Sequence, residues 1–139
     1  MKNIIYLLLL APLTLMGGLD SLKVNSTLMN IKASKPLKFY NGDKSLTIKK
    51  VLAASSKESA DIILFPLKSE NKKIQIVKSY KSLKTNKDSV GAIYFKNDRT
   101  QIVFVKERLK KNGLKLSDKY KKYIINECQL SPICLLSMY

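Results

Sequence analysis

The sequence predicts a small α/β domain with a mixed β-sheet that contains hairpins, followed by two C-terminal helices. Several short apolar runs are rich in β-branched and aromatic residues and end at turn residues, which is typical of strands. Turn-forming dipeptides separate some of these runs, which indicates hairpins. After residue 105 the apolar spacing changes from a strand period to a helical one.

The N-terminus has the three parts of an export signal. Met1-Lys2-Asn3 is positively charged, residues 4–16 are apolar and uncharged, and Gly17-Gly18 ends the run. The run is shorter than the roughly 20 residues that a membrane-spanning helix needs. We therefore expect residues 1–20 to be a signal peptide of a periplasmic protein. The cleavage sequence is weak, so tethering by an uncut signal stays open, as does a buried N-terminal element of a cytosolic protein.

Residues 21–139 are enough for one domain but not for two. The stretch 21–34 is expected to be a lead-in, with a short strand followed by a loose helical turn. A hairpin is predicted over residues 37–52, because Asn41-Gly42 is a strong two-residue hairpin signal between apolar runs.

The middle of the chain predicts one buried strand and one strand followed by a helix. Residues 61–65 hold four consecutive apolar residues bounded by Asp and Pro, which is typical of a strand buried on both faces. Residues 73–77 are rich in β-branched residues, which favours a strand. A helix through Ile74, Val77, Tyr80 and Leu83 fits the apolar spacing as well. Apolar spacing through Tyr80 and Leu83 then predicts a short helix.

The clearest hairpin in the sequence joins residues 90–96 to 101–105, and both strands carry apolar residues on both faces. A helix over 106–112 is expected to end at Gly113 in a Schellman motif, with Leu109 meeting Leu114. A second helix is predicted from a Ser117 cap to about Glu127.

The charge balance is strongly basic. The chain has 26 basic and 10 acidic residues and a formal net charge of +16, yet only Arg99 and Arg108 are arginines. Nucleic-acid-binding proteins favour Arg for contacts to phosphate and bases. Because an exported protein also rarely meets nucleic acid, we predict no nucleic-acid partner. Lysine scattered among Ile and Asn is typical of an AT-rich genome. A functional basic face toward an anionic membrane or an acidic protein stays open.

The sequence has no histidine. This absence excludes Ser-His-Asp and Cys-His nucleophile activation and any zinc site that uses histidine. The acidic residues lie mainly at turns and element ends, where they have structural roles. We therefore predict no catalytic residue, no metal and no cofactor. The remaining enzymatic alternative is a hydrolase that uses only Asp, Glu, Lys or Ser.

Cys128 and Cys134 are the only cysteines. In an exported protein, a close pair near the C-terminus predicts a disulfide. Pro132 between them would turn the chain, and the bond would hold the apolar tail against the last helix. A metal site, a redox-active pair and two buried thiols are the other interpretations.

Residues 46–125 resemble the YfiR-like (HmsC-like) family of bacterial periplasmic proteins. The resemblance is carried by four segments: Leu46-Thr-Ile-Lys-Lys-Val51, Ala60-Asp-Ile-Ile-Leu-Phe65, Val90-Gly-Ala-Ile-Tyr-Phe95 and Lys111-Asn-Gly-Leu-Lys-Leu-Ser117. It implies a protein without catalysis that restrains an inner-membrane diguanylate cyclase, with disulfides that support the fold.

The chain departs from that family in three ways. It lacks Trp, leaves no room for the family's N-terminal helix, and has no helix pattern between the strands at 61–65 and 74–77, so we expect a shortened relative. The predicted function is periplasmic regulation or binding, without catalysis, through a membrane signalling partner. The alternative is a secreted basic protein on an anionic membrane or polysaccharide surface. The sequence leaves the oligomeric state open.

Overall fold

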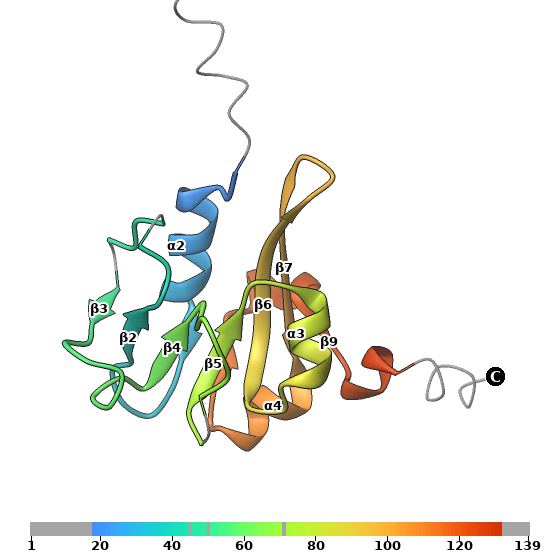
Figure 1. Ribbon diagram of the computed structural model, residues 1–139. Helices are drawn as coiled ribbons and strands as arrows, with labels where there is room; N and C mark the ends of the chain where they lie inside the picture. Colours follow the sequence, from blue (N-terminus) through green and yellow to red (C-terminus); the bar gives the residue numbers. More distant parts are fainter. Residues whose placement is uncertain (1–17, 45, 50, 71, 132–139) are drawn as a thin grey trace, which may run out of the picture.

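The computed structural model describes residues 18–44, 46–49, 51–70 and 72–131. These residues form a seven-stranded mixed sheet, a two-stranded sheet and short helices, which confirms the predicted small α/β fold (Figure 1). The helices are α2 (Ser21–Met29), α3 (Tyr80–Thr85), α4 (Lys106–Lys111) and the 3₁₀ helices η2 (Asp118–Tyr123) and η3 (Glu127–Leu130). The strands are β1 (Ile31–Lys32), β2 (Lys38–Asn41), β3 (Leu52–Ala53), β4 (Ile62–Leu64), β5 (Ile74–Val77), β6 (Ser89–Lys96), β7 (Arg99–Val105), β8 (Lys115–Leu116) and β9 (Ile124–Ile125).

The large sheet has the strand order β3-β2-β4-β5-β6-β7-β9. Its strands pair in parallel except β6 and β7, which are antiparallel. The predicted hairpin at residues 90–105 is therefore confirmed. Its two turn residues, Asn97 and Asp98, have φ angles of 54° and 58°, the left-handed values that a type I′ turn requires.

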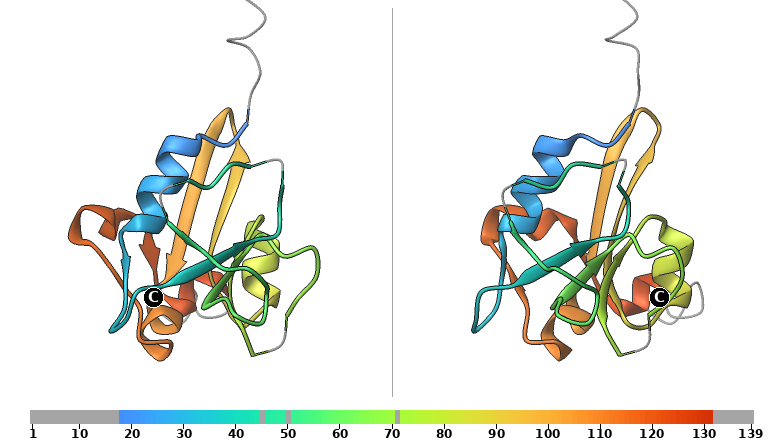
Figure 2. Two further views of the ribbon diagram at one scale, coloured as in Figure 1. Left: turned by 90° about the vertical axis from the view of Figure 1, so that its left-hand side faces the viewer. Right: turned by 60° about the vertical axis from the view of Figure 1, so that its left-hand side comes forward.

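Helices cover both faces of this sheet (Figure 2). Val24 of α2 packs on one face, in a core cluster with Ile76 and Phe104. Leu83 of α3 packs on the other, in a cluster with Val77. Neighbouring strand residues thus enter opposite clusters, because successive side chains of a strand alternate between faces. The predicted strands at 61–65 and 73–77 and the predicted short helix after them are confirmed as β4, β5 and α3. All three lie within this three-layer arrangement.

The predicted hairpin over residues 37–52 is wrong. Strand β2 pairs in parallel with both β3 and β4, so that Phe39 faces Ala53 and Ile62. Gly42 continues from β2 instead of forming a hairpin turn, and its N–H donates to the Leu64 oxygen at 2.7 Å. A Cβ atom at Gly42 would lie 2.6 Å from the Phe65 oxygen, so glycine permits a close backbone approach here.

The lead-in predicted over residues 21–34 is also wrong, since its first part is the nine-residue helix α2. Asp20 caps this helix, and its Oδ1 accepts hydrogen bonds from the backbone N–H groups of Leu22 and Lys23. Two polar residues on the buried face, Asn25 and Thr27, donate to backbone oxygens one turn earlier. This polar content hid the helical pattern. The chain therefore has room for an N-terminal helix, contrary to the expectation above.

The end of α4 confirms the predicted Schellman motif. Gly113 has a φ of 69°. Its N–H donates to the Lys110 oxygen at 3.1 Å, and the N–H of Leu114 donates to the Leu109 oxygen at 2.8 Å. Leu109 and Leu114 are both buried, as the motif's hydrophobic contact requires.

The second C-terminal helix does not run from Ser117 to Glu127 as predicted. It is a 3₁₀ helix, η2, that ends at Tyr123, and the strand β9 and the helix η3 follow it. Ser117 makes no side-chain cap hydrogen bond. The β-branched pair in β9 extends the sheet beside β7, with Ile124 opposite Phe104, which stops the helix from continuing.

Two predictions fall partly outside the described residues. These are the signal peptide, of which residues 1–17 are not described, and the pairing partner Cys134. Within the described part of the chain, the helices are all too short or too polar to cross a bilayer.

Candidate functional site

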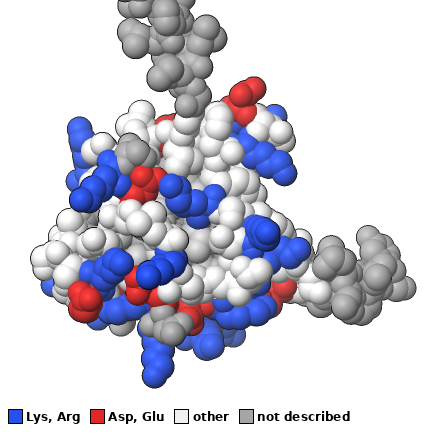
Figure 3. All heavy atoms as spheres, viewed as in Figure 1, with Lys and Arg blue, Asp and Glu red and all other residues white. Residues whose placement is uncertain are grey.

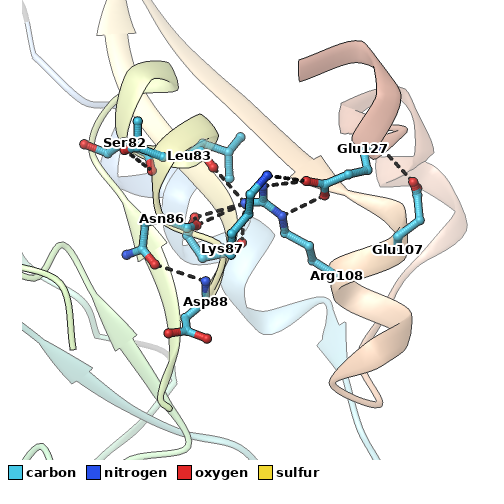
Figure 4. Close-up of polar contacts among 10 residues, drawn as sticks. Ser82, Leu83, Asn86, Lys87, Asp88, Glu107, Arg108 and Glu127 are labelled. Carbon is cyan, nitrogen blue, oxygen red and sulfur yellow. Dashed lines mark hydrogen bonds and ion pairs between the residues drawn. The ribbon is translucent and has the colours of Figure 1, made fainter. Parts of the chain in front are cut away.

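A buried arginine joins four elements in the C-terminal half (Figure 4). The Arg108 side chain is only 6% exposed. One terminal nitrogen donates to the backbone oxygens of Leu83 at 2.7 Å, Ser89 at 2.9 Å and Asn86 at 3.1 Å. Its Nε and its other terminal nitrogen donate to the two carboxylate oxygens of Glu127, both at 2.8 Å. We call these five residues the Arg108 centre.

The carboxylate of Glu127 is held in its charged form. Hydrogen bonding from Arg108, reinforced by the charges of Arg108 and Lys87, lowers the pKa of Glu127 against the opposing effect of burial. The Lys87 ammonium lies 3.3 Å from the same carboxylate. The backbone N–H of Glu127 donates to the Glu107 carboxylate at 2.7 Å, which fixes the start of η3 to α4.

The geometry of the Arg108 centre is that of a structural connection. The planar guanidinium is satisfied by a bidentate carboxylate and by carbonyl groups at the end of α3 and the start of β6. Sequence reasoning missed this role, because Arg108 lies in a lysine-rich helix. The only available signal was that it is one of two arginines among 26 basic residues.

The remaining described carboxylates do not converge on a reactive centre. Four of them form ion pairs with lysines, as Asp61 does with Lys35, Asp43 with Lys78, Glu70 with Lys57 and Asp118 with Lys121. Within the described residues, no group of three or more His, Cys, Asp or Glu side chains is arranged to hold a metal ion.

The predicted disulfide is placed only in part. Cys128 is half-buried in η3, next to Glu127 of the Arg108 centre. Cys134 lies outside the described residues, so its pairing with Cys128 stays a prediction.

The outer side of α2 carries the best candidate for a docking surface. Leu22 and Met29 are large apolar residues that are 76% and 44% exposed. They line a hollow of about 600 Å³ together with Thr47, Lys49 and Lys119. We call this the α2 hollow. Leu22 and Met29 lie seven positions apart, which places them on one side of the helix two turns apart.

The helix η2 brings aromatic and basic groups beside the α2 hollow. The hydroxyl of Tyr120 hydrogen-bonds the Ser26 hydroxyl of α2, which joins the two helices. The Lys119 ammonium lies 5.2 Å from the centre of the Tyr120 ring, and that of Lys23 lies 5.6 Å from the centre of the Tyr123 ring. Both distances are typical of cation–π contacts.

The basic residues are spread widely. In the view of Figure 3, lysine and arginine atoms lie in several separate groups, with acidic atoms among some of them. On this face the distribution is typical of a solvated surface in a lysine-rich protein and differs from one continuous basic patch.

Comparisons with family models, curated proteins and solved structures found no match to this chain. The resemblance to the YfiR-like family therefore rests on the sequence motifs alone.

Proposed function

We propose that this is an exported regulatory protein without catalysis that docks on the extracytoplasmic domain of a membrane signalling protein. The observation that carries the proposal is the exposed apolar pair on α2, Leu22 and Met29. The opposite side of the same helix is anchored by Val24 and Leu28, which are 0% and 1% exposed. A helix held by one face that leaves large apolar side chains on the other fits a protein interface.

The surroundings of this pair fit a partner surface that is apolar at its centre and acidic at its edge. Lys49 and Lys119 line the same hollow, so an acidic rim on the partner would meet positive charge. Interfaces place apolar anchors centrally and charges around them. The family resemblance implies a partner such as a diguanylate cyclase.

Affinity capture from membranes tests this proposal. The tagged protein is expressed in its own host, cross-linked, and recovered with its partners for mass spectrometry. A membrane protein with an extracytoplasmic domain should be recovered. Replacing Leu22 and Met29 together by Asp should reduce its recovery at least tenfold, because charge would enter the centre of the interface.

Leu67→Asp is the matched control. Leu67 is 95% exposed in the loop between β4 and β5, so the substitution adds charge without removing buried contacts. Recovery should stay unchanged. Equal losses for the control and the double variant, or no loss for either, would contradict docking through α2.

The alternative function is adhesion to an anionic membrane or polysaccharide, which the formal charge of +16 favours. Adhesion of this kind is electrostatic, so it should disappear at moderate ionic strength, where charges are screened over about 8–10 Å. Docking through apolar side chains should survive the same salt. Measuring binding to phosphatidylglycerol vesicles and to the captured partner at 0.05 and about 0.5 M salt separates the two functions.

A further inference from the structure

A second hollow lies away from the α2 hollow, between α4, β8 and β9. Its floor consists of Leu109, Leu114, Leu116 and Ile124, and its volume is about 380 Å³. We call it the α4 hollow. The first three floor residues are 3–6% exposed and belong to the main core cluster, so the floor is fixed by the packing of the domain.

The size and chemistry of the floor favour a hydrocarbon ligand. An apolar cavity of roughly 150 Å³ is enough to hold a benzene ring, so this hollow exceeds the space that a single aromatic side chain needs. Its volume falls within the roughly 300–1,000 Å³ range of small-molecule pockets. The four floor side chains offer no polar atoms, so a group that enters gains by leaving water and finds no side-chain hydrogen bond there.

The rim has the opposite character. The other four residues that line the hollow are all lysines, and none of the lining residues is acidic. Lys121 pairs with Asp118 at 3.3 Å, with both side chains largely exposed. Within the described part of the chain, Lys106, Lys110 and Lys115 form no ion pair, so their positive charge is available to a ligand.

We propose that the α4 hollow binds a single-chain anionic amphiphile of the fatty-acid type. The hydrocarbon chain would lie on the leucine and isoleucine floor, and the carboxylate would lie among the lysines at the rim. An acidic peptide is less well matched, because the hollow is larger than one side chain and its floor side chains offer no hydrogen bonds to a backbone. This site is separate from the α2 hollow and goes beyond the docking function.

Ligand titration of the purified protein, followed by methyl NMR, tests the proposal. Dodecanoate is added below its micelle concentration, and the methyl signals of Leu116 and Ile124 are followed. We expect saturable shifts at these two residues. Dodecanol, which keeps the chain but lacks the charge, should bind at least tenfold more weakly, and butyrate, which keeps only the charge, should cause no shift.

A pair of charge-reversal variants tests the role of the rim. Lys110→Glu with Lys115→Glu should weaken dodecanoate binding at least tenfold. Lys81→Glu with Lys84→Glu makes the same change of net charge on exposed residues of α3 and should leave binding within twofold of the original protein. Urea unfolding should show similar, small losses of stability for both double variants, because all four lysines are exposed and each pair includes one lysine in the last turn of a helix.

Three outcomes would overturn the proposal. If dodecanol bound as tightly as dodecanoate, the lysines would not contribute to ligand binding. Equal weakening by the α3 variant would show general charge attraction. Binding to phosphatidylglycerol vesicles without any response to monomeric dodecanoate would assign the surface to membrane adhesion instead.

Discussion

The two ends of the large sheet are built differently. Strands β6 and β7 are eight and seven residues long and pair in antiparallel register over six residue pairs. At the other end, β2, β3 and β4 are two to four residues long and pair in parallel. The first end is stabilised by a long ladder and the Arg108 centre, and the second depends on a few close contacts. We infer that the β3 edge opens at lower free energy than the β6–β7 end.

A few polar contacts support the short parallel strands. The backbone N–H of Lys38 donates to the Asp61 carboxylate at 2.8 Å, which ties the start of β2 to the residue before β4. This hydrogen bond, together with Lys35, lowers the pKa of Asp61 against the effect of burial. Each end of the sheet thus has one carboxylate that the fold keeps charged, which is Asp61 here and Glu127 at the other end.

The largest expected effect is the loss of the buried guanidinium. Arg108→Ala should reduce the free energy of unfolding by about 3–5 kcal/mol, because it removes the donor from three backbone oxygens and from the Glu127 carboxylate. Arg108→Lys should reduce the free energy of unfolding by less, since lysine keeps the positive charge but cannot make the bidentate contact. Urea denaturation measures both. Arg99→Ala, at the exposed start of β7, is the control and should stay within about 0.5 kcal/mol.

A smaller loss is expected at the parallel end. Gly42→Ala should destabilise the protein by about 1–3 kcal/mol, because the new methyl group would press against the backbone of residues 64–65. Hydrogen exchange should show faster opening of β2 and β4 than of β6. An unchanged stability of Gly42→Ala would show that the close approach is not required.

The acid dependence of stability compares the two carboxylates. Because the folded pKa of Glu127 lies below its ordinary value of 4.5, the unfolded chain binds its proton more readily. Its stabilising contribution is present above that ordinary value and is lost as the pH falls through the folded pKa. Glu127→Gln should therefore narrow the stability difference between pH 7 and pH 3, measured by urea denaturation. Asp61→Asn should narrow this difference as well. If either variant left the stability difference between pH 7 and pH 3 unchanged, the role assigned to that carboxylate would be contradicted.

The smallest expected effect is a gain at the hairpin turn. Asp98 has a φ of 58°, a conformation that costs a residue other than glycine roughly 1 kcal/mol. Asp98→Gly should raise the free energy of unfolding by about 0.5–1 kcal/mol, since Asn-Gly suits a type I′ turn. Thermal unfolding detects this change. A loss of stability would show that the Asp98 side chain contributes more than its backbone conformation costs.

Local signals predicted the parts of the fold that close within a few residues. The β6–β7 hairpin and the stop at Gly113 both depend on contacts between near neighbours, and both are confirmed. Parallel pairing is not visible in the same way, because its partners are distant in the chain. Gly42 illustrates this limit: its sequence neighbours indicate a turn, but the residue that requires a glycine there is Phe65.

The candidate surfaces were less predictable than the fold. The α2 hollow depends on a helix whose buried face includes Asn25 and Thr27, which masked its apolar period. The α4 hollow combines residues from α4, β8, η2 and β9, and β9 was expected to be helical. In the Arg108 centre, the Arg108 side chain donates to the backbone oxygen of Leu83 and to the carboxylate of Glu127, and apolar patterns reveal neither hydrogen bond.

The pairing of β1 with β8 has a consequence for the order of folding. Ile31 pairs with Leu116, and the backbone N–H of Asp20 donates to the Thr100 hydroxyl at 2.7 Å, so the N-terminal elements are completed by residues of the C-terminal half. A chain that emerges with its N-terminus first cannot finish this domain until nearly all of it is available, and such non-local contacts form slowly. The lysine-rich composition then favours solubility before folding is complete, because the positive charges of unfolded chains repel one another.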